Sequence, residues 1–168
     1  TRGVAGTASI VKQKVSKTPD RTHKVEVVKL TKDFDKISIS PSKKPVVSII
    51  IPVYNHFEHT YNCLKSIADL KGSSSFEVIV VDDCSTDNTQ EQIKLVSGII
   101  YQRQINNGGF IESCNTGAKM ANGQYLMFLN NDTIVHPNWL DSLIDVFNNY
   151  SDAGLVGSKL IYPTNQLQ

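Results

Sequence analysis

Apolar runs alternate with polar stretches along the chain from about residue 45 onward. VVSIIIPV, at 46–53, is a continuous run rich in β-branched residues, which is typical of a strand buried on both faces. Four later apolar runs also predict strands, at 76–81, 99–103, 125–129 and 154–162. The last of them is interrupted by Gly157.

Helical patterns fill the intervals between these strands. Phe57, Tyr61 and Leu64 recur at the spacing of one helix face. The apolar periods and capping residues together predict helices at 56–70, 87–96, 110–121 and 136–150. Regular alternation of strand and helix favours an α/β fold with a mostly parallel sheet flanked by helices.

The first 44 residues differ from the rest of the chain. Residues 1–45 carry a charge balance of +7, whereas residues 46–168 carry −6. KVEVVKL at 24–30 and KISIS at 36–40 predict short strands. We therefore divide the chain into a basic leader or linker at 1–44 and a folded region at 45–168.

Two interpretations of the basic leader stay open. It is either a solvated connector from an upstream region, or a basic strip that contacts anionic lipid or glycan at a membrane surface. A nucleic-acid partner is not expected, because no aromatic residues interleave the lysines.

Composition narrows the class of protein further. The chain has 168 residues, of which 40% are hydrophobic, enough for the core of one domain. No apolar run approaches the roughly 20 residues that span a bilayer. The odd count of three cysteines matches no zinc or redox motif, which predicts reduced thiols in a cytoplasmic protein. Because the chain lacks an initiator Met, we expect a piece of a longer protein.

Polar residues follow each of the first four predicted strands. Tyr54 and Asn55 follow the first, and Asp82 and Asp83 the second. The segments NNGG at 106–109 and NND at 130–132 follow the third and fourth strands. Parallel sheets bind ligands outside the carboxyl ends of their strands. The sequence thus predicts a binding cleft at one sheet edge.

Each residue type suggests a task in that cleft. Tyr54 offers a face to a planar ring, and Pro52 shapes the wall beside it. Asp83 can accept a hydrogen bond from the imide or amine edge of such a ring. Gly108 and Gly109 allow the backbone to approach a ligand closely.

The polar triplet after the fourth strand suggests a cation held together with phosphates. Asp132 supplies a hard oxygen ligand for Mg²⁺ or Mn²⁺, cations often held by one or two carboxylates plus substrate phosphates. Asn130 and Asn131 can bind a ribose or phosphate without adding repulsive charge.

Simpler structural roles remain open for several of these residues. Asp82 or Asp83 could cap the helix that follows, and Asp87 is expected to be a helix cap. His136 is interpreted as a helix-entry residue and Trp139 as a packing residue.

Three motifs resemble the N-terminal half of the family 2 glycosyltransferases, which have the Rossmann-like GT-A fold. They are VSIIIPVYN, FEVIVVDDCSTDNT and GQYLMFLNNDT, and the resemblance covers about residues 45–168. The segment NNGGFIESCNTGAKMANG also resembles the family between the third and fourth strands.

The resemblance implies a nucleotide-sugar donor, with a UDP- or dTDP-sugar expected. It assigns donor nucleotide binding to Pro52, Tyr54, Asp83, Gly108 and Asn131. The family's DxD motif corresponds to the triplet at 130–132, whose last residue, Asp132, is the ligand of a divalent cation, Mg or Mn.

The triplet departs from strict DxD because its first two residues are Asn. It is similar to a variant in rhamnosyltransferase-like enzymes that build bacterial surface polysaccharides. The implied reaction is inverting transfer to a glycan or lipid-linked acceptor. We expect a cytoplasmic protein, and the inner face of the membrane is the alternative location if the basic leader contacts lipid. The catalytic base is unknown and expected beyond Gln168. The alternative is a non-catalytic nucleotide- or glycan-binding α/β module.

Overall fold

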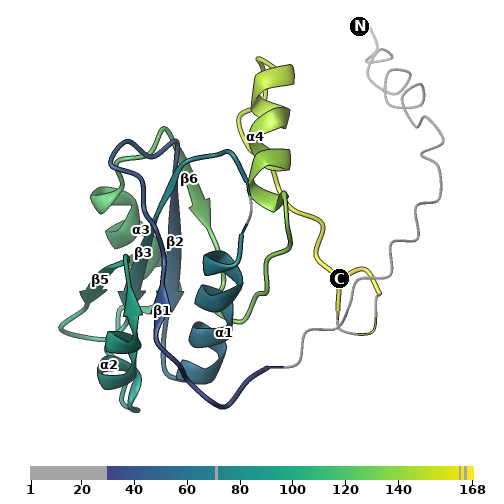
Figure 1. Cartoon of the computed structure of the whole chain (residues 1–168). Coiled ribbons are helices and arrows are strands. Elements are labelled where there is room, and N and C mark those ends of the chain that lie inside the picture. Colours follow the sequence, from purple (N-terminus) through teal and green to yellow (C-terminus); the bar gives the residue numbers. More distant parts are fainter. Residues whose placement is uncertain (1–29, 71, 163, 165) are drawn as a thin grey trace, which may run out of the picture.

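The computed structural model describes residues 30–70, 72–162, 164 and 166–168 (Figure 1). The predicted strand at 24–30 lies almost wholly outside these residues. The elements follow in the order β1 (Ile37–Ser38), β2 (Val47–Val53), α1 (Phe57–Ala68), β3 (Phe76–Asp82), α2 (Thr89–Gln92), a 3₁₀ turn η2 (Ile93–Leu95), β4 (Val96–Ser97), β5 (Ile100–Arg103), α3 (Gly109–Met120), β6 (Tyr125–Phe128) and α4 (Trp139–Asn149).

The main sheet has four parallel strands in the order β5-β3-β2-β6. β2 and β3 pair along their full length, from Val47 opposite Phe76 to Val53 opposite Asp82. β1 and β4 form a separate two-stranded parallel pair. The predicted α/β fold with a mostly parallel sheet is confirmed, and the strands of the main sheet all end at one edge.

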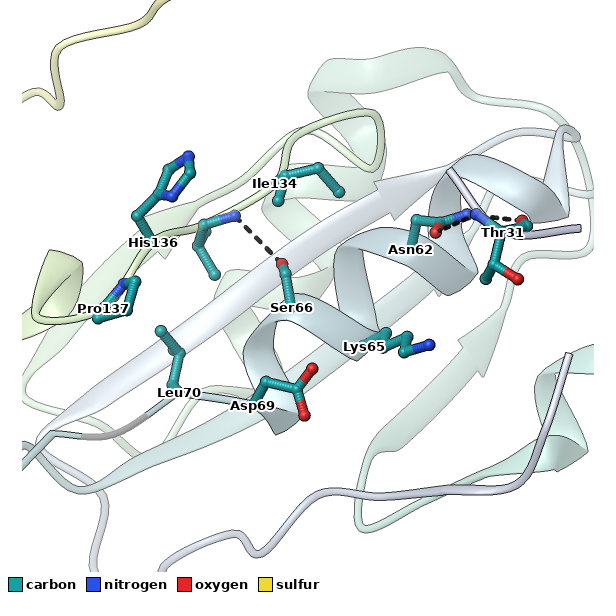
Figure 2. Close-up of a pocket in the computed structure, with 10 residues that line it drawn as sticks. Thr31, Asn62, Lys65, Ser66, Asp69, Leu70, Ile134, His136 and Pro137 are labelled. Atoms are coloured by element: carbon teal, nitrogen blue, oxygen red, sulfur yellow. Dashed lines mark hydrogen bonds between the residues drawn. The ribbon is translucent and has the colours of Figure 1, made fainter. Parts of the chain in front are cut away.

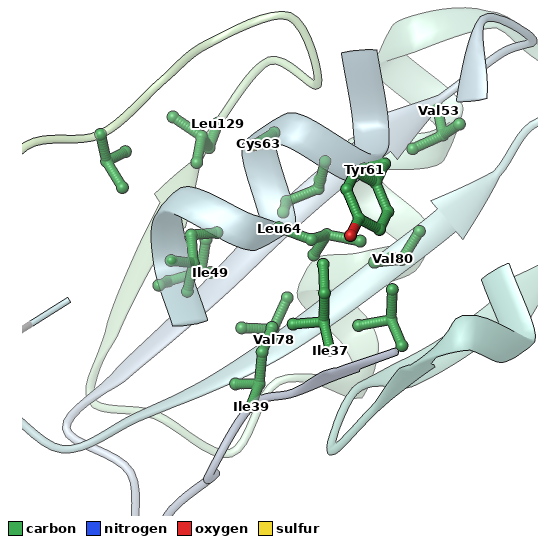
Figure 3. Packing of buried hydrophobic residues seen from close by; sticks show 14 of the residues in the cluster. Ile37, Ile39, Ile49, Val53, Tyr61, Cys63, Leu64, Val78, Val80 and Leu129 are labelled. Carbon is green, nitrogen blue, oxygen red and sulfur yellow. The ribbon is translucent and has the colours of Figure 1, made fainter. Parts of the chain in front are cut away.

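Helices cover both faces of the main sheet. Residues 49, 51 and 53 of β2 pack with α1 and α4 in the larger apolar cluster. Figure 3 shows Ile49 and Val53 with Leu64 of α1. Ile50 of β2 packs on the opposite face, together with Ile79, Val81 and the carboxyl-terminal part of α3. This strict alternation explains why β2 contains no exposed residue.

Part of the predicted leader packs into the same core. Thr31 exchanges two backbone hydrogen bonds with the Asn62 side chain of α1, at 3.0 and 3.1 Å. The Phe34 ring meets Phe57 edge-on, with centroids 5.2 Å apart. Ile37 and Ile39 are buried in the larger cluster. Residues 31–39 therefore stabilise α1, although the domain division near residue 45 stays a prediction.

The predicted strand at 154–162 is wrong. Only Ile161 forms a bridge there, antiparallel to Leu167, and the segment has no other regular structure. Leu155 is 90% exposed. The apolar pattern was sufficient for a strand, but a strand also needs a neighbouring strand to satisfy its backbone groups, and this segment pairs with none of the main sheet.

The predicted helix at 87–96 is shorter than expected. α2 has one turn and passes into η2, because Val96 and Ser97 pair with β1 instead of continuing the helix. The other helices and the predicted strands at 46–53, 76–81, 99–103 and 125–129 are confirmed, with their ends shifted by up to three residues. Within the described part of the chain, no helix is long and apolar enough to cross a membrane.

Candidate functional site

The ends of β2 and β3 carry backbone conformations that ordinary residues rarely adopt. Asn55, His56 and Cys84 have φ angles of 58°, 55° and 61°. Left-handed conformations at non-glycine residues cost free energy and persist where the surroundings enforce them. Three of the four non-glycine residues with positive φ in the described part of the chain therefore lie at the predicted cleft edge, and the fourth, Asn138, precedes α4.

Asn55 holds the loop after β3 in place. Its side-chain Oδ1 accepts hydrogen bonds from the backbone N–H groups of Thr86 and Asp87, at 2.7 and 3.2 Å. Its own N–H donates to Ser85 Oγ, at 2.8 Å. Hydrogen bonds through Asn55 thus connect the ends of β2 and β3. Asp87 accepts from the N–H of Thr89, the first residue of α2, at 2.9 Å, but the N-cap position itself is occupied by Asn88.

Asp82 is fully buried and serves the fold instead of the cleft. Its Oδ2 accepts from Tyr101 Oη and Arg103 Nη1, both at 2.6 Å, and its Oδ1 accepts from Ser85 N at 2.8 Å. Burial raises the pKa of Asp82, but the hydrogen bonds from Ser85, Tyr101 and Arg103 outweigh burial and bring this pKa below its ordinary value.

Asp83 links the end of β3 to the start of α3. Its Oδ1 accepts from Gly108 N at 2.7 Å and from Gln104 Nε2 at 3.0 Å, and its Oδ2 accepts from Gly109 N at 2.8 Å. Only 3% of Asp83 is exposed. Asp83 therefore caps α3, and neither Asp82 nor Asp83 caps α2, the helix that directly follows them. Gly109 has φ +81°, which suits glycine.

The two residues proposed to contact a planar ring differ in exposure. Tyr54 is 49% exposed, directly after β2 ends. Pro52 is buried within β2, opposite Val81 of β3. Tyr54 can therefore present its ring to a ligand, whereas Pro52 shapes the sheet beneath it.

The triplet after β6 anchors itself to α1 and leaves its carboxylate exposed. Asn131 Nδ2 donates to the buried hydroxyl of Thr60 at 3.0 Å. The Asn130 carbonyl accepts from Thr133 N at 3.2 Å and lies 3.8 Å from Cys63 Sγ. Asp132 is exposed, and within the described residues no hydrogen bond engages its carboxylate.

These residues fit a divalent cation that binds with a phosphate ligand. In the described part of the chain, no group of three or more His, Cys, Asp or Glu residues could enclose a metal ion. A single exposed carboxylate beside two amides instead suits Mg²⁺ or Mn²⁺ that keeps substrate oxygens and waters as its other ligands. Burial and then the Asp132 charge raise the pKa of Cys63 to about 12, so this thiol stays neutral.

A pocket of about 260 Å³ lies elsewhere (Figure 2). One wall is formed by α1 from Asn62 onward together with Asp69 and Leu70, which follow the helix, and residues 134–137 form the other. None of the predicted donor-binding residues lines it. His136 and Pro137 lie at its rim, before α4 begins. The cleft predicted at the strand ends is separate from this pocket.

Sequence reasoning missed three residues that organise the site. Arg103 and Tyr101 hold Asp82, and Gln104 holds Asp83. The sequence did contain a signal for Arg103. Arg103 ends the predicted strand at 99–103, and the oppositely charged Asp82 follows the predicted strand at 76–81. The role of Gln104 had no such signal, because its bonds depend on the path of the loop between β5 and α3.

Residues 48–167 match the family described as Glycosyl transferase family 2. The chain is 33% identical over 102 residues to the poly(ribitol-phosphate) beta-N-acetylglucosaminyltransferase TarP of Staphylococcus aureus. This alignment covers 58% of this chain and 31% of TarP. It is 32% identical over 124 residues to the glycosyltransferase AglE of Haloferax volcanii, covering 71% of this chain and 40% of AglE. The chain thus spans about a third of the length of these relatives.

Solved structures show the same fold. Residues 1–349 of Staphylococcus aureus TarS, in complex with UDP-GlcNAc, match with a TM-score of 0.56 and 27% identity, over 62% of this chain and 32% of that one. The mannosyltransferase PcManGT of Pyrobaculum calidifontis matches with a TM-score of 0.58 and 21% identity, over 80% of this chain and 41% of that one.

The family match runs from Ser48 in β2 past the end of α4 and therefore includes each strand end that carries polar residues of the predicted cleft. The parallel sheet has the arrangement of the GT-A domains that it matches. The chain belongs to the family 2 glycosyltransferases.

Proposed function

We propose that this chain binds the nucleotide-sugar donor of a glycosyltransferase that acts in cell-surface polysaccharide synthesis. The donor is a UDP- or dTDP-sugar, and the acceptor is a glycan or lipid-linked glycan. Transfer is inverting, takes place on the cytoplasmic side and requires Mg²⁺ or Mn²⁺. One observation carries the proposal: within the family-matched segment, four parallel strands deliver Tyr54, Asp83, Gly108 and Asp132 to the same sheet edge.

The proposed roles follow from exposure and hydrogen bonding. The half-exposed Tyr54 ring stacks on the base. A carboxylate has about four acceptor sites, and three donors occupy Asp83, so one acceptor site remains for a base N–H. The uridine nucleotides bound by TarS support a pyrimidine donor. Asp132 holds the cation, which stabilises the departing diphosphate.

Calorimetry on the 168-residue chain tests donor binding. UDP and dTDP should bind more tightly than CDP, since uracil and thymine carry an imide N–H where cytosine carries an acceptor. Asp83→Ala should reduce this discrimination more than it reduces affinity for inorganic pyrophosphate. Equal binding of all three nucleotides by the unaltered chain would contradict the assignment of Asp83.

The cation is tested with a matched pair of variants. Asp132→Asn should abolish the gain in UDP affinity that Mg²⁺ or Mn²⁺ produces, whereas Asp152→Asn should retain it. Both carboxylates are exposed, but Asp152 lies in the turn after α4. UDP affinity that is unchanged by excess chelator would remove the cation from the proposal.

Activity distinguishes an enzyme from a non-catalytic binding module. The natural full-length protein should release nucleoside diphosphate only when acceptor is present, and Asp132→Asn in it should slow release by at least about a hundredfold. Binding of UDP without acceptor-dependent release in that protein would instead favour the binding module.

A further inference from the structure

Gln104 joins three elements at the cleft. It is the first residue after β5, and its backbone N–H donates to the Asp82 carbonyl at 2.8 Å. Its side-chain Nε2 donates to Asp83 Oδ1 at 3.0 Å and to Ser113 Oγ at 2.8 Å. Ser113 lies on α3 and is fully buried. Both N–H groups of one amide are therefore used, one by the cleft carboxylate and one by α3.

This arrangement determines which Asp83 oxygen remains available. Gln104 and Gly108 both donate to Oδ1, whereas only Gly109 donates to Oδ2. Since each carboxylate oxygen offers about two acceptor sites, Oδ1 is saturated and Oδ2 retains one. Without Gln104, Oδ1 would regain an acceptor site and the carboxylate could rotate.

We propose that Gln104 is a positioning residue for nucleobase selection: by saturating Oδ1 of Asp83, it directs the single free acceptor site of Oδ2 toward the N–H of a pyrimidine imide. The inference rests on the proposed function and deepens it. Gln104 itself does not touch the nucleotide; it acts through Asp83, and the buried Ser113 hydroxyl fixes the amide that does so.

A purely structural role for Gln104 predicts a different outcome. Loss of its side chain would then lower the melting temperature and weaken all ligands alike. A positioning role predicts that the ratio of UDP to CDP affinity changes, while affinity for inorganic pyrophosphate does not. The ratio therefore separates the two roles.

The test compares Gln104→Leu with Gln102→Leu in the 168-residue chain. Gln102 is an exposed residue of β5 whose side chain donates to the Arg103 carbonyl and contacts neither Asp83 nor α3 by hydrogen bond. Calorimetry should show the UDP-to-CDP ratio falling roughly tenfold in Gln104→Leu, the size expected for one hydrogen bond to a charged group. Gln102→Leu should match the unaltered chain. An unchanged ratio in Gln104→Leu would overturn the inference.

A double-mutant cycle tests whether Gln104 acts through Asp83. Adding Gln104→Leu to Asp83→Ala should change the ratio no further, and independent, additive losses would overturn the inference. If Gln104→Leu does not fold, Ser113→Ala replaces it in the test. This variant removes the hydroxyl that holds the Gln104 amide and should lower the UDP-to-CDP affinity ratio by a smaller factor. An unchanged ratio in Ser113→Ala would then overturn the proposal.

The outcomes keep the two proposals apart. An unaltered chain that binds no nucleoside diphosphate would overturn the proposed function, and this inference with it. A chain whose discrimination depends on Asp83 but not on Gln104 would leave the proposed function standing and overturn only the role of Gln104.

Discussion

Arg103 and Asp82 are register partners on neighbouring strands, and Arg103 Nη1 donates to Asp82 Oδ2 across 2.6 Å. The Asp82 side chain is fully buried, while 27% of the Arg103 side chain is exposed. Removing the arginine would leave a buried carboxylate with only Tyr101 and Ser85 as partners. Such a loss is more costly than the loss of a surface ion pair.

Arg103→Met should therefore lower the free energy of unfolding by about 3 kcal/mol at neutral pH, as for other broken buried pairs. The folded-state pKa of Asp82 lies below its ordinary value, so the pair stabilises the fold above that ordinary pKa and is lost as pH falls through the folded pKa. The deficit of the variant should shrink below about pH 4. Denaturant titrations of the variant and the unaltered chain at several pH values measure this difference in the free energy of unfolding.

Lys94→Met is the control for this prediction. Lys94 and Glu91 form a pair whose side chains are 68% and 73% exposed. Its loss should change the free energy of unfolding by less than about 0.5 kcal/mol. Equal effects of the two variants would mean that the Asp82 pair behaves as a surface pair.

Glu77 lies at the opposite end of β3 from Asp82. It is 6% exposed, and its Oε1 accepts from Ser48 Oγ at 2.6 Å and Asn122 N at 2.7 Å. Burial raises the pKa of Glu77, but hydrogen bonds from Ser48, Asn122 and Gly123 outweigh it and lower this pKa. Glu77→Gln should lower the free energy of unfolding by about 2 kcal/mol at neutral pH. The substitution replaces one acceptor oxygen with an NH₂ group, which cannot accept hydrogen bonds from the surrounding donors.

The Glu77→Gln deficit should diminish as acid protonates the wild-type carboxylate, which chemical unfolding at pH 7 and pH 3 would reveal. Glu112→Gln, on the exposed side of α3, should leave stability unchanged. A deficit that persists in acid would indicate altered packing as its cause.

Tyr54 should contribute to binding through its ring alone. Tyr54→Ala should weaken UDP binding by about 1–3 kcal/mol, the value of one stacked base, and Tyr54→Phe should preserve it. Tyr150→Ala, which removes another exposed tyrosine beyond α4, should bind UDP normally. Calorimetry measures all three. Weakened binding in Tyr54→Phe would show that the hydroxyl, and not stacking, matters.

The three cysteines should differ in reactivity. Cys63 is fully buried, and burial followed by the Asp132 charge raises its pKa to about 12, whereas Cys84 and Cys114 are partly exposed. Maleimide labelling of the native protein near neutral pH should modify Cys84 and Cys114 and spare Cys63, as peptide mass spectrometry would show. All three should react in denaturant. Native labelling of Cys63 would contradict its burial on the inner face of α1.

The sequence predicted the parallel sheet well because buried strands and amphipathic helices have distinct local periods. The prediction of a strand at 154–162 was wrong because an apolar pattern is a local property, whereas a strand also needs a pairing partner that the local pattern does not encode. Likewise, the pattern in 87–96 could not show that Val96 pairs with Ile37, a residue almost sixty positions away.

Candidate site residues were predictable as a group but not in their individual contacts. The rule for parallel strand ends placed Tyr54 and Asp132 at one edge, as the structure has them. That Asp83 is covered by Gly108 and Gly109 depends on a loop path that no local period encodes. The donor-binding roles of these residues stay predictions.

The two carboxylates of β3 also restrict how this strand can align during folding. Glu77 and Asp82 are five positions apart, so they face opposite sides of the sheet. A slip of one residue would exchange those sides and remove both carboxylates from their donors at once. Misaligned forms would therefore bury two unpaired charges, one near each end of the strand. The central strand pair consequently has a penalty against misregistration that apolar residues, which tolerate either side, do not provide.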